Sequence, residues 1–583
     1  MKRREFLGKA GSATAAAAGL TGCATVSGSG ERGAKGSAGT GIDGDRTAHR
    51  NQNRSTVVCQ HGMACTSQPL ASLAAIDVLR AGGNAVDAAI AANALLSLVE
   101  PMNCGPGGDL FALVWMEQEQ KLAGLNASGR APYAWNLDEV RRLGLADIPP
   151  YSPLAWSVPG CVSGWKALLD RFGTMAPAQL FEPAIRYGRE GFPLSPIIAR
   201  GWGAMDPAQF PTLAATFAPG GQRPAYGDIH TNPDLADFYE ILVRDGLDAF
   251  YQGEVADRMA RFSEANGGYF TLRDFQDHTA TWVEPASTSY RGYDVWQIPP
   301  NGQGICVLQM LNLLEQFDIG AMAPNGPAQM HLFIEAKKLA FEDRAIYYAD
   351  MDFADVPVEA LISKEYAASR AKLIDPRRAS ERPVPGEFDA SDTIYLTTAD
   401  GAGNMVSLIQ STYHGWGSHI VPDRLGFPIQ NRGCSFALDP AHRNRLEPHK
   451  RPFHTIIPAF VTRERRPVFS FGVMGGAFQP QGHCQVLMNL IDFGMSPQEA
   501  GEQPRIEHSG SSDPDGSRLT GGGTVKTERH FPEKTKAALA RMGHTLSEDI
   551  GAFGGYQGIW REEGPRRYFG GTDPRKDGCA LGY

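Results

Sequence analysis

The junction Ser391-Asp392-Thr393 precedes two segments with the composition of paired strands. Residues 393–398 are rich in β-branched and aromatic side chains, residues 400–404 favour a turn, and residues 405–411 form a second apolar run. A hairpin that is symmetric about this turn places Thr393 opposite Ser411, with Cβ atoms about 5 Å apart. The sequence therefore predicts two adjacent hydroxyl groups, which fit an ordinary cross-strand pair or a reactive site.

Glycine-rich and polar motifs surround this junction in a fixed order. They are Met63–Ala71, Gly82–Ala89, Val99–Pro101, Gly105–Asp109, Val158–Gly160, Pro299–Gly304, Gly475-Gly476 and Asp573–Gly578. Together they resemble the γ-glutamyltransferase (glutathione hydrolase) family, within the N-terminal-nucleophile hydrolases, from about Gly62 to Tyr583. The resemblance implies an α+β fold, a four-layer αββα sandwich built from two subunits of one processed precursor.

The resemblance also implies self-cleavage. Members of this family cut their own chain before a threonine, which here places the cut between Asp392 and Thr393. The large subunit would then comprise residues 55–392 and the small, catalytic subunit residues 393–583. The two subunits are expected to stay together as a heterodimer that forms one αββα domain.

A threonine hydroxyl is a weak nucleophile and requires a base. Once Thr393 begins a chain, its own α-amine, with an ordinary pKa of about 7.7–8.0, can take that role. This chemistry needs no metal and no organic cofactor. Gly475-Gly476 lies between a predicted strand, residues 468–473, and a predicted helix, residues 484–493. The pair fits a plain strand-to-helix turn, but the resemblance assigns its two N–H groups to an oxyanion hole.

The chain departs from the family pattern where the substrate would be bound. Ile394-Tyr395 follow the nucleophile in place of Thr-His, and Ser411 replaces the second threonine. No arginine occupies the expected glutamate-binding position, although Arg130 lies close to it. Arg130 is the leading candidate for binding the substrate anion and would supply that charge from a shifted position; the alternative is a structural role.

Two further segments lack the groups that would hold an α-amine. Residues 430–435 contain no acid and include Arg432, and His454-Thr455 stand where the family has paired serines. Because a desolvated ammonium requires anionic or multiple acceptors, an anionic acyl group without an α-amine fits Arg130, Arg432 and His454 better. His454, next to Phe453, fits a buried structural residue equally well.

These observations predict an amidohydrolase or acyltransferase that cleaves γ-glutamyl amides such as glutathione through an acyl-enzyme on Thr393. One alternative is hydrolysis of a non-glutamyl amide such as oxamate or an acylase substrate. Another is a catalytically inactive lipoprotein that only binds a ligand. The expected partner in each case is a small molecule.

The N-terminus resembles a bacterial export signal. Arg3-Arg4 precede a short apolar stretch, residues 10–20, which is too short to span a bilayer as a helix. Leu20–Cys23 then resembles a lipobox. We expect a Tat/lipoprotein signal peptide over residues 1–22, lipidation of Cys23 and a flexible tether over residues 23–54. If Cys23 is incidental, the leader is a Tat signal alone.

Composition limits the remaining possibilities. The net charge is −9 and no basic stripe occurs, which argues against nucleic-acid binding. The nine cysteines include no C-x-x-C, so zinc and redox motifs are poorly supported. We therefore expect an enzyme of the bacterial cell envelope, on the periplasmic or extracytoplasmic face, that contacts the membrane only through a lipid anchor.

Overall fold

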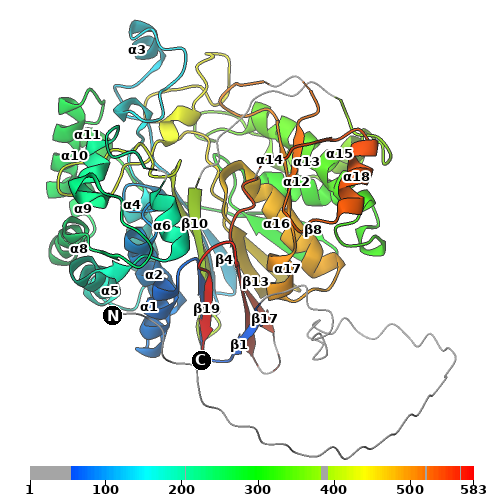
Figure 1. Cartoon of the computed structure of the whole chain (residues 1–583), viewed down its shortest axis with the longest axis horizontal. Helices are drawn as coiled ribbons and strands as arrows, with labels where there is room; N and C mark the ends of the chain where they lie inside the picture. Colours follow the sequence, from blue (N-terminus) through cyan, green and yellow to red (C-terminus); the bar gives the residue numbers. More distant parts are fainter. Residues whose placement is uncertain are drawn as a thin grey trace, which may run out of the picture. The chain divides into compact units, whose positions relative to one another are not determined.

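The computed structural model describes residues 54–203, 205–381, 392–518, 521–549, 551–562, 564 and 566–583. Two seven-stranded sheets pack face to face, and helices cover the outer side of each sheet (Figure 1). This arrangement confirms the predicted αββα fold.

The first sheet contains the predicted nucleophile. Its strands, in spatial order, are β19 (Cys579–Gly582), β2 (Met63–Thr66), β10 (Asp392–Ala399), β11 (Met405–Tyr413), β3 (Asp109–Met116), β4 (Lys121–Ala127) and β7 (Thr281–Val283). All neighbouring strands in this sheet are antiparallel. Strands from both predicted subunits therefore lie side by side within one sheet, with β2 of the large subunit between β19 and β10.

The second sheet contains, in spatial order, β1 (Val57–Cys59), β18 (Arg567–Thr572), β17 (Tyr556–Glu562), β13 (Arg466–Val473), β12 (Ala459–Arg463), β9 (Tyr293–Gln297) and β8 (Ala286–Tyr290). Two small sheets lie outside the sandwich: β14 (Ile506–Ser509), β15 (Thr524–Thr527) and β16 (Thr545–Leu546); and β5 (Phe192–Pro193) with β6 (Ile229–His230).

One helical layer covers the first sheet and shares a large apolar core with it. Its main helices are α1 (Pro69–Arg80), α2 (Ala85–Val99), α4 (Cys161–Phe172), α5 (Pro177–Glu190), α8 (Pro233–Asp245) and α10 (Glu254–Ala265). Shorter helices on this side of the molecule are α6 (Pro196–Trp202), α7 (Pro211–Phe217), α9 (Ala249–Gln252) and α11 (Leu272–Gln276), and α3 (Leu137–Arg142) packs on a separate small core.

The other helical layer covers the second sheet. It contains α12 (Gly304–Leu314), α13 (Pro327–Tyr347), α14 (Val358–Leu361), α15 (Lys364–Ala371), α16 (Gln479–Leu487), α17 (Pro497–Glu502) and α18 (Glu533–Arg541). A third core lies between the two sheets and includes Phe111, Tyr395, Ile409 and Phe460.

The hairpin register follows the prediction up to its last pair. Ile394 pairs with Gln410, and the ladder continues without interruption to Ala399 and Met405. Asp392 pairs with Tyr413, however, so the register shifts across Thr393. Such a bulge bends a strand and redirects a side chain.

The sequence favours helices over residues 70–80, 84–99, 303–317 and 327–348 by its apolar spacing and end signals, and the structure has α1, α2, α12 and α13 there, with ends that differ by a few residues. Asn84 caps α2 in a reciprocal capping box with Asp87, as its composition favours. The helix predicted over residues 484–493 instead begins at Gln479, because Pro480 is tolerated in a first helical turn.

None of the described helices has an apolar stretch long enough to cross a membrane. The eight described cysteines are all free thiols. The predicted signal peptide, Cys23 and nearly all of the predicted tether lie outside the described residues.

Candidate active site

The side chain of Thr393 lies between two elements that the sequence separates widely. Its Oγ1 donates a hydrogen bond to Ser411 Oγ on β11 at 3.3 Å and accepts one from Gln479 Nε2 on α16 at 3.4 Å. Ser411 Oγ also accepts from the Tyr413 N–H at 2.8 Å, which orients the serine hydroxyl. Thr393 is almost fully buried. The predicted hydroxyl pair is therefore present, with Gln479 as a third member that the sequence did not indicate.

Gly475-Gly476 connects β13 to the short 3₁₀ helix that leads into α16. Gly475 has φ +120°, a conformation that side-chain-bearing residues rarely adopt. Within the described part of the chain, neither glycine N–H is bonded to a backbone carbonyl. Gln479, which donates to the Thr393 hydroxyl, follows Gly476 by three residues, so this turn and the Thr393 contact belong to one short segment of the chain.

Gln303 holds the peptide group that follows Gly476 in place. Its Nε2 donates to the carbonyl of Gly476 at 2.8 Å and to that of Thr455 at 2.7 Å, while its Oε1 accepts from Arg344. The motif Pro299–Gly304 was visible in the sequence, but only the fold shows that its buried glutamine joins the glycine turn to the Thr455 segment.

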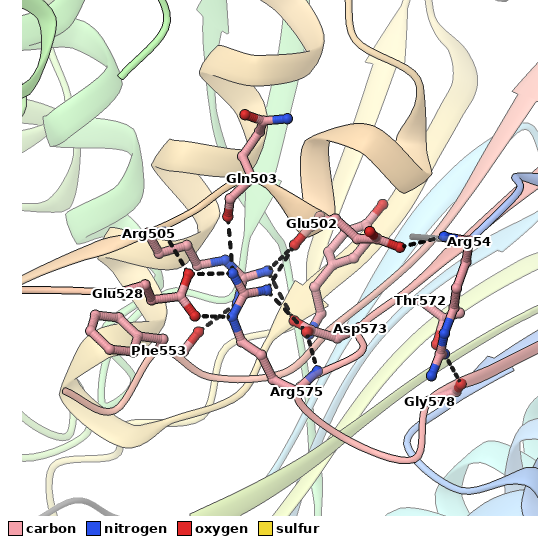
Figure 2. Close-up of polar contacts among 12 residues, drawn as sticks. Arg54, Glu502, Gln503, Arg505, Glu528, Phe553, Thr572, Asp573, Arg575 and Gly578 are labelled. Atoms are coloured by element: carbon pink, nitrogen blue, oxygen red, sulfur yellow. Dashed lines mark hydrogen bonds and ion pairs between the residues drawn. The ribbon is translucent and has the colours of Figure 1, made fainter. Parts of the chain in front are cut away.

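An ion network holds the loop that contacts the glycine turn, with Arg505 and Asp573 buried and Arg575 and Glu528 partly buried. Figure 2 shows the guanidinium groups of Arg505 and Arg575 against each other, beside the carboxylates of Asp573 and Glu528. Arg505 also donates to the carbonyl of Phe553. The closing sequence motif that contains Asp573 thus forms part of a compensated cluster of two cations and two anions.

This network determines where the loop after residue 551 lies. The Tyr556 N–H donates to Asp573 Oδ2 at 2.7 Å, and the Met474 N–H donates to the Gly555 carbonyl at 3.0 Å. A Cβ added at Gly475 would lie 3.3 Å from the Cα of Gly554. The loop held by the ions therefore forms the back wall of the glycine turn.

Arg432 is a buried cation with unused donors. Its Nη1 donates to Thr455 Oγ1 at 2.8 Å, and its guanidinium carbon lies 3.8 Å from the centre of the Tyr413 ring. Its Nε and Nη2 have no hydrogen-bond partner among the described residues. Burial lowers the pKa of Arg432 to about 10, so the group stays charged at neutral pH. Since Tyr413 pairs with Asp392, this charge lies beside the predicted processing junction.

The other arginine proposed from the sequence has different surroundings. Arg130 forms ion pairs with Asp350 at 3.6 Å and Asp352 at 3.2 Å, and it donates to the carbonyl of His449. Its charge is therefore already balanced by two carboxylates. Its contact with a substrate stays a prediction, and of these two arginines it is Arg432 that has unpaired buried donors among the described residues.

His454 is fully buried and both ring nitrogens are engaged. Nδ1 accepts from the Ile456 N–H at 3.2 Å, which leaves the proton on Nε2, 2.9 Å from Asp109 Oδ2. Burial lowers the pKa of His454 to about 4, so the ring is neutral at neutral pH. The structural alternative for His454 thus has clear support, and its substrate contact stays a prediction.

One cluster of metal-ligand type occurs among the described residues: His331, Glu335 and His544. Its polar atoms already bind one another and their neighbours, with His331 Nδ1 2.8 Å from His544 Nε2 and Glu335 paired with Lys338. The cluster is far in sequence from Thr393 and forms a satisfied hydrogen-bond network. The chemistry predicted for Thr393 uses none of these three residues.

The sequence profile described as gamma-glutamyltranspeptidase matches residues 71–583. The chain belongs to the gamma-glutamyltranspeptidase family. The glutathione hydrolase-like YwrD proenzyme of Bacillus subtilis is 36% identical over 537 residues, covering 90% of this chain and 99% of the relative. The oxamate amidohydrolase proenzyme of Klebsiella pneumoniae is 33% identical over 542 residues, covering 91% and 100%.

A solved structure extends this comparison. The cephalosporin acylase from Bacillus halodurans superposes with a TM-score of 0.85 at 41% identity, covering 93% of this chain and 99% of the acylase. This gamma-glutamyltranspeptidase-family protein is therefore an enzyme whose relatives are proenzymes with different named substrates. The departure Ile394-Tyr395 has a structural explanation, because both side chains are fully buried in the cores on opposite sides of β10.

Proposed function

We propose that this protein is a self-processing amidohydrolase with Thr393 as its nucleophile. In maturation, the Thr393 hydroxyl attacks the carbonyl carbon of Asp392, and the Thr393 nitrogen leaves as the amine. Water then hydrolyses the resulting ester, which releases the Asp392 carboxylate and restores the hydroxyl. The observation that carries this proposal is the contact of the Thr393 and Ser411 hydroxyls beside Gly475-Gly476.

In turnover, the free α-amine of Thr393 takes the proton of its own hydroxyl, and the oxygen attacks the carbonyl of a substrate amide. The leaving amine receives that proton, and water later hydrolyses the acyl ester. The N–H groups of Gly475 and Gly476 are the donors we assign to the oxyanion. One such donor contributes about 3 kcal/mol to lowering the barrier.

We further propose that the acyl group carries a carboxylate and lacks an α-ammonium group. The unpaired Nε and Nη2 of Arg432 provide two donors in a buried site, which favours a bidentate anion. The named substrates of the relatives, oxamate and glutathione among them, include amides with such a carboxylate. Glutathione remains the second candidate, because its glutamyl carboxylate could bind Arg432 in the same way.

The first experiment tests the nucleophile. Purified protein should migrate as two fragments on a denaturing gel, and N-terminal sequencing of the smaller should begin at Thr393. Thr393→Ala should remain one chain and release no product. A protein that stays intact and still hydrolyses an amide would falsify the proposal.

The second experiment tests the acyl group. Processed enzyme is given p-nitroanilides of dicarboxylic acids from oxalyl to adipyl, their unbranched neutral analogues, and the γ-glutamyl anilide. We expect preference for a carboxylate-bearing acyl group without the amine. Equal or better cleavage of the γ-glutamyl anilide would instead support the glutathione candidate.

We also propose export by the Tat system and lipidation at Cys23, on the basis of the leader motif alone. Expression in a bacterial host with labelled palmitate should label the wild-type protein and leave Cys23→Ala unlabelled. Label in both variants, or in neither, would contradict this part of the proposal.

A further inference from the structure

Asp109 is a buried carboxylate that the proposed chemistry does not use. It is the first residue of β3, and it pairs in register with Ser411 on the neighbouring strand. Its side chain is completely inaccessible to solvent. A buried carboxylate requires hydrogen-bond donors, so the identity of these donors shows what Asp109 does.

Four donors converge on this carboxylate. Oδ1 accepts from the Gly129 N–H at 2.8 Å, the Gly160 N–H at 3.2 Å and Gln430 Nε2 at 2.8 Å. Oδ2 accepts from His454 Nε2 at 2.9 Å. The close approach at Gly160 requires glycine, since a Cβ there would lie 2.1 Å from the Ala127 carbonyl oxygen.

The donors lie on segments that carry the candidate substrate groups. Gln430 is two residues before Arg432, and His454 directly precedes Thr455, whose hydroxyl accepts from Arg432. One carboxylate of the predicted large subunit thereby joins two segments of the predicted small subunit. The distance between the Arg432 segment and the Thr455 segment is fixed through this shared acceptor.

The contact of Asp109 with His454 is a hydrogen bond to a neutral ring. His454 is neutral, because its Nδ1 accepts a backbone N–H and burial lowers its pKa to about 4. Burial also lowers the pKa of Arg432 to about 10, so its guanidinium stays charged at neutral pH, and its Nε and Nη2 have no hydrogen-bond partner among the described residues. Asp109 therefore acts on Arg432 through the position of its segment and leaves these donors available to a substrate.

We propose that Asp109 is a specificity-determining positioning residue. Its carboxylate holds the Arg432 and Thr455 segments in register, so that the free donors of Arg432 are placed to select an acyl group that carries a carboxylate. This inference rests on the proposed function, since it assigns a selectivity to the same reaction. It also explains why the motifs Gly105–Asp109 and Val158–Gly160 accompany the nucleophile in this chain.

The test compares Asp109→Asn with a matched control. Asparagine keeps a carbonyl oxygen for the three Oδ1 donors, but its amide nitrogen takes the place of Oδ2 and cannot accept a hydrogen bond from His454 Nε2. The control is Asp400→Asn, at the other end of β10, where a buried carboxylate likewise accepts the N–H groups of Ala402, Gly403 and Asn404. Both variants are assayed as processed enzyme with one dicarboxylic p-nitroanilide and its neutral analogue.

For Asp109→Asn, we expect kcat/KM for the carboxylate-bearing anilide to fall by at least about tenfold, mainly through KM. The neutral analogue should change by less than about threefold, and the Asp400→Asn enzyme should keep the wild-type ratio between the two anilides. An equal fall for both anilides, or an unchanged ratio, overturns the inference.

If Asp109→Asn yields no soluble processed enzyme, Asp109→Glu decides the question. Glutamate keeps two acceptor oxygens but displaces them from the four donors, so the preference for the carboxylate-bearing anilide should fall as predicted for Asp109→Asn. A preference equal to that of the wild-type enzyme overturns the inference. If the wild-type enzyme cleaves neither anilide, the proposed function fails and the inference fails with it; if only the variant comparison fails, the proposed function stands.

Discussion

Replacing Arg432 with methionine tests the proposed anion site directly. Methionine has a similar length and no polar group, so it can occupy the buried position without leaving an unpaired donor. The change removes the two free donors, Nε and Nη2, and the bond from Nη1 to Thr455 Oγ1. It also removes the cation above the Tyr413 ring.

The size of the effect follows from the two free donors. A hydrogen bond to a charged group contributes about 1.5–3 kcal/mol, so two such bonds to a bound carboxylate contribute about 3–6 kcal/mol. Each 1.36 kcal/mol corresponds to a factor of ten in rate, at about 25 °C. We therefore expect kcat/KM for a carboxylate-bearing anilide to fall by about 10²–10⁴-fold, where two full bonds form.

The assay uses processed Arg432→Met enzyme, a dicarboxylic p-nitroanilide and its neutral analogue, which serves as an internal control. Self-cleavage is measured separately on a denaturing gel and only processed enzyme enters the comparison, because Arg432 lies beside the predicted junction at Asp392. Arg130→Met, measured in parallel, separates the two arginines, because Asp350 and Asp352 already balance Arg130. If Arg432→Met slows both anilides equally, or if Arg130→Met alone abolishes the preference, the assignment to Arg432 is wrong.

Three further changes test other parts of the site. Gly475→Ala places a Cβ at φ +120° and should lower kcat by about 100-fold or more. The control, Gly494→Ala, has open space around the added Cβ and should keep the wild-type kcat. Equal kcat values for the two variants would contradict the oxyanion assignment. Arg505→Met leaves Asp573 undercompensated and should lower the free energy of unfolding by about 3–5 kcal/mol, measured by denaturant titration against wild type; no change would show that Arg575 suffices. Burial lowers the pKa of His454 from 6.5 to about 4, so the contribution of the neutral ring to folding stability is present above pH 6.5 and is lost as the pH falls through 4. A thermal unfolding midpoint that stays constant between pH 6.5 and pH 4 would contradict this prediction.

The sequence was sufficient for the local features of the nucleophile. β-Branched runs and a turn predicted β10 and β11, and the alternation of side chains fixed their pairing from Ile394 onward. These features depend on neighbours within a few residues, and a sequence displays such neighbours directly. The resemblance supplied the four-layer fold, which periodicity alone did not specify.

The bulge at Thr393 and the residues that surround its hydroxyl required the fold. Gln479 and Gln303 reach the site from α16 and from the start of α12, and neither has a local sequence signal for that role. Their importance comes from contacts between segments that are far apart along the chain.

Arg130 and Arg432 give the clearest example of contacts that the sequence alone could not predict. The sequence favours Arg130 for the substrate anion and presents Arg432 as a further positive charge near a candidate binding motif. Tertiary structure gives Arg130 two carboxylate partners and leaves two buried donors of Arg432 unpaired. The sequence determined which charges this protein contains; only the packing of distant segments decided which of them is neutralised, because pairing depends on distance and burial in space.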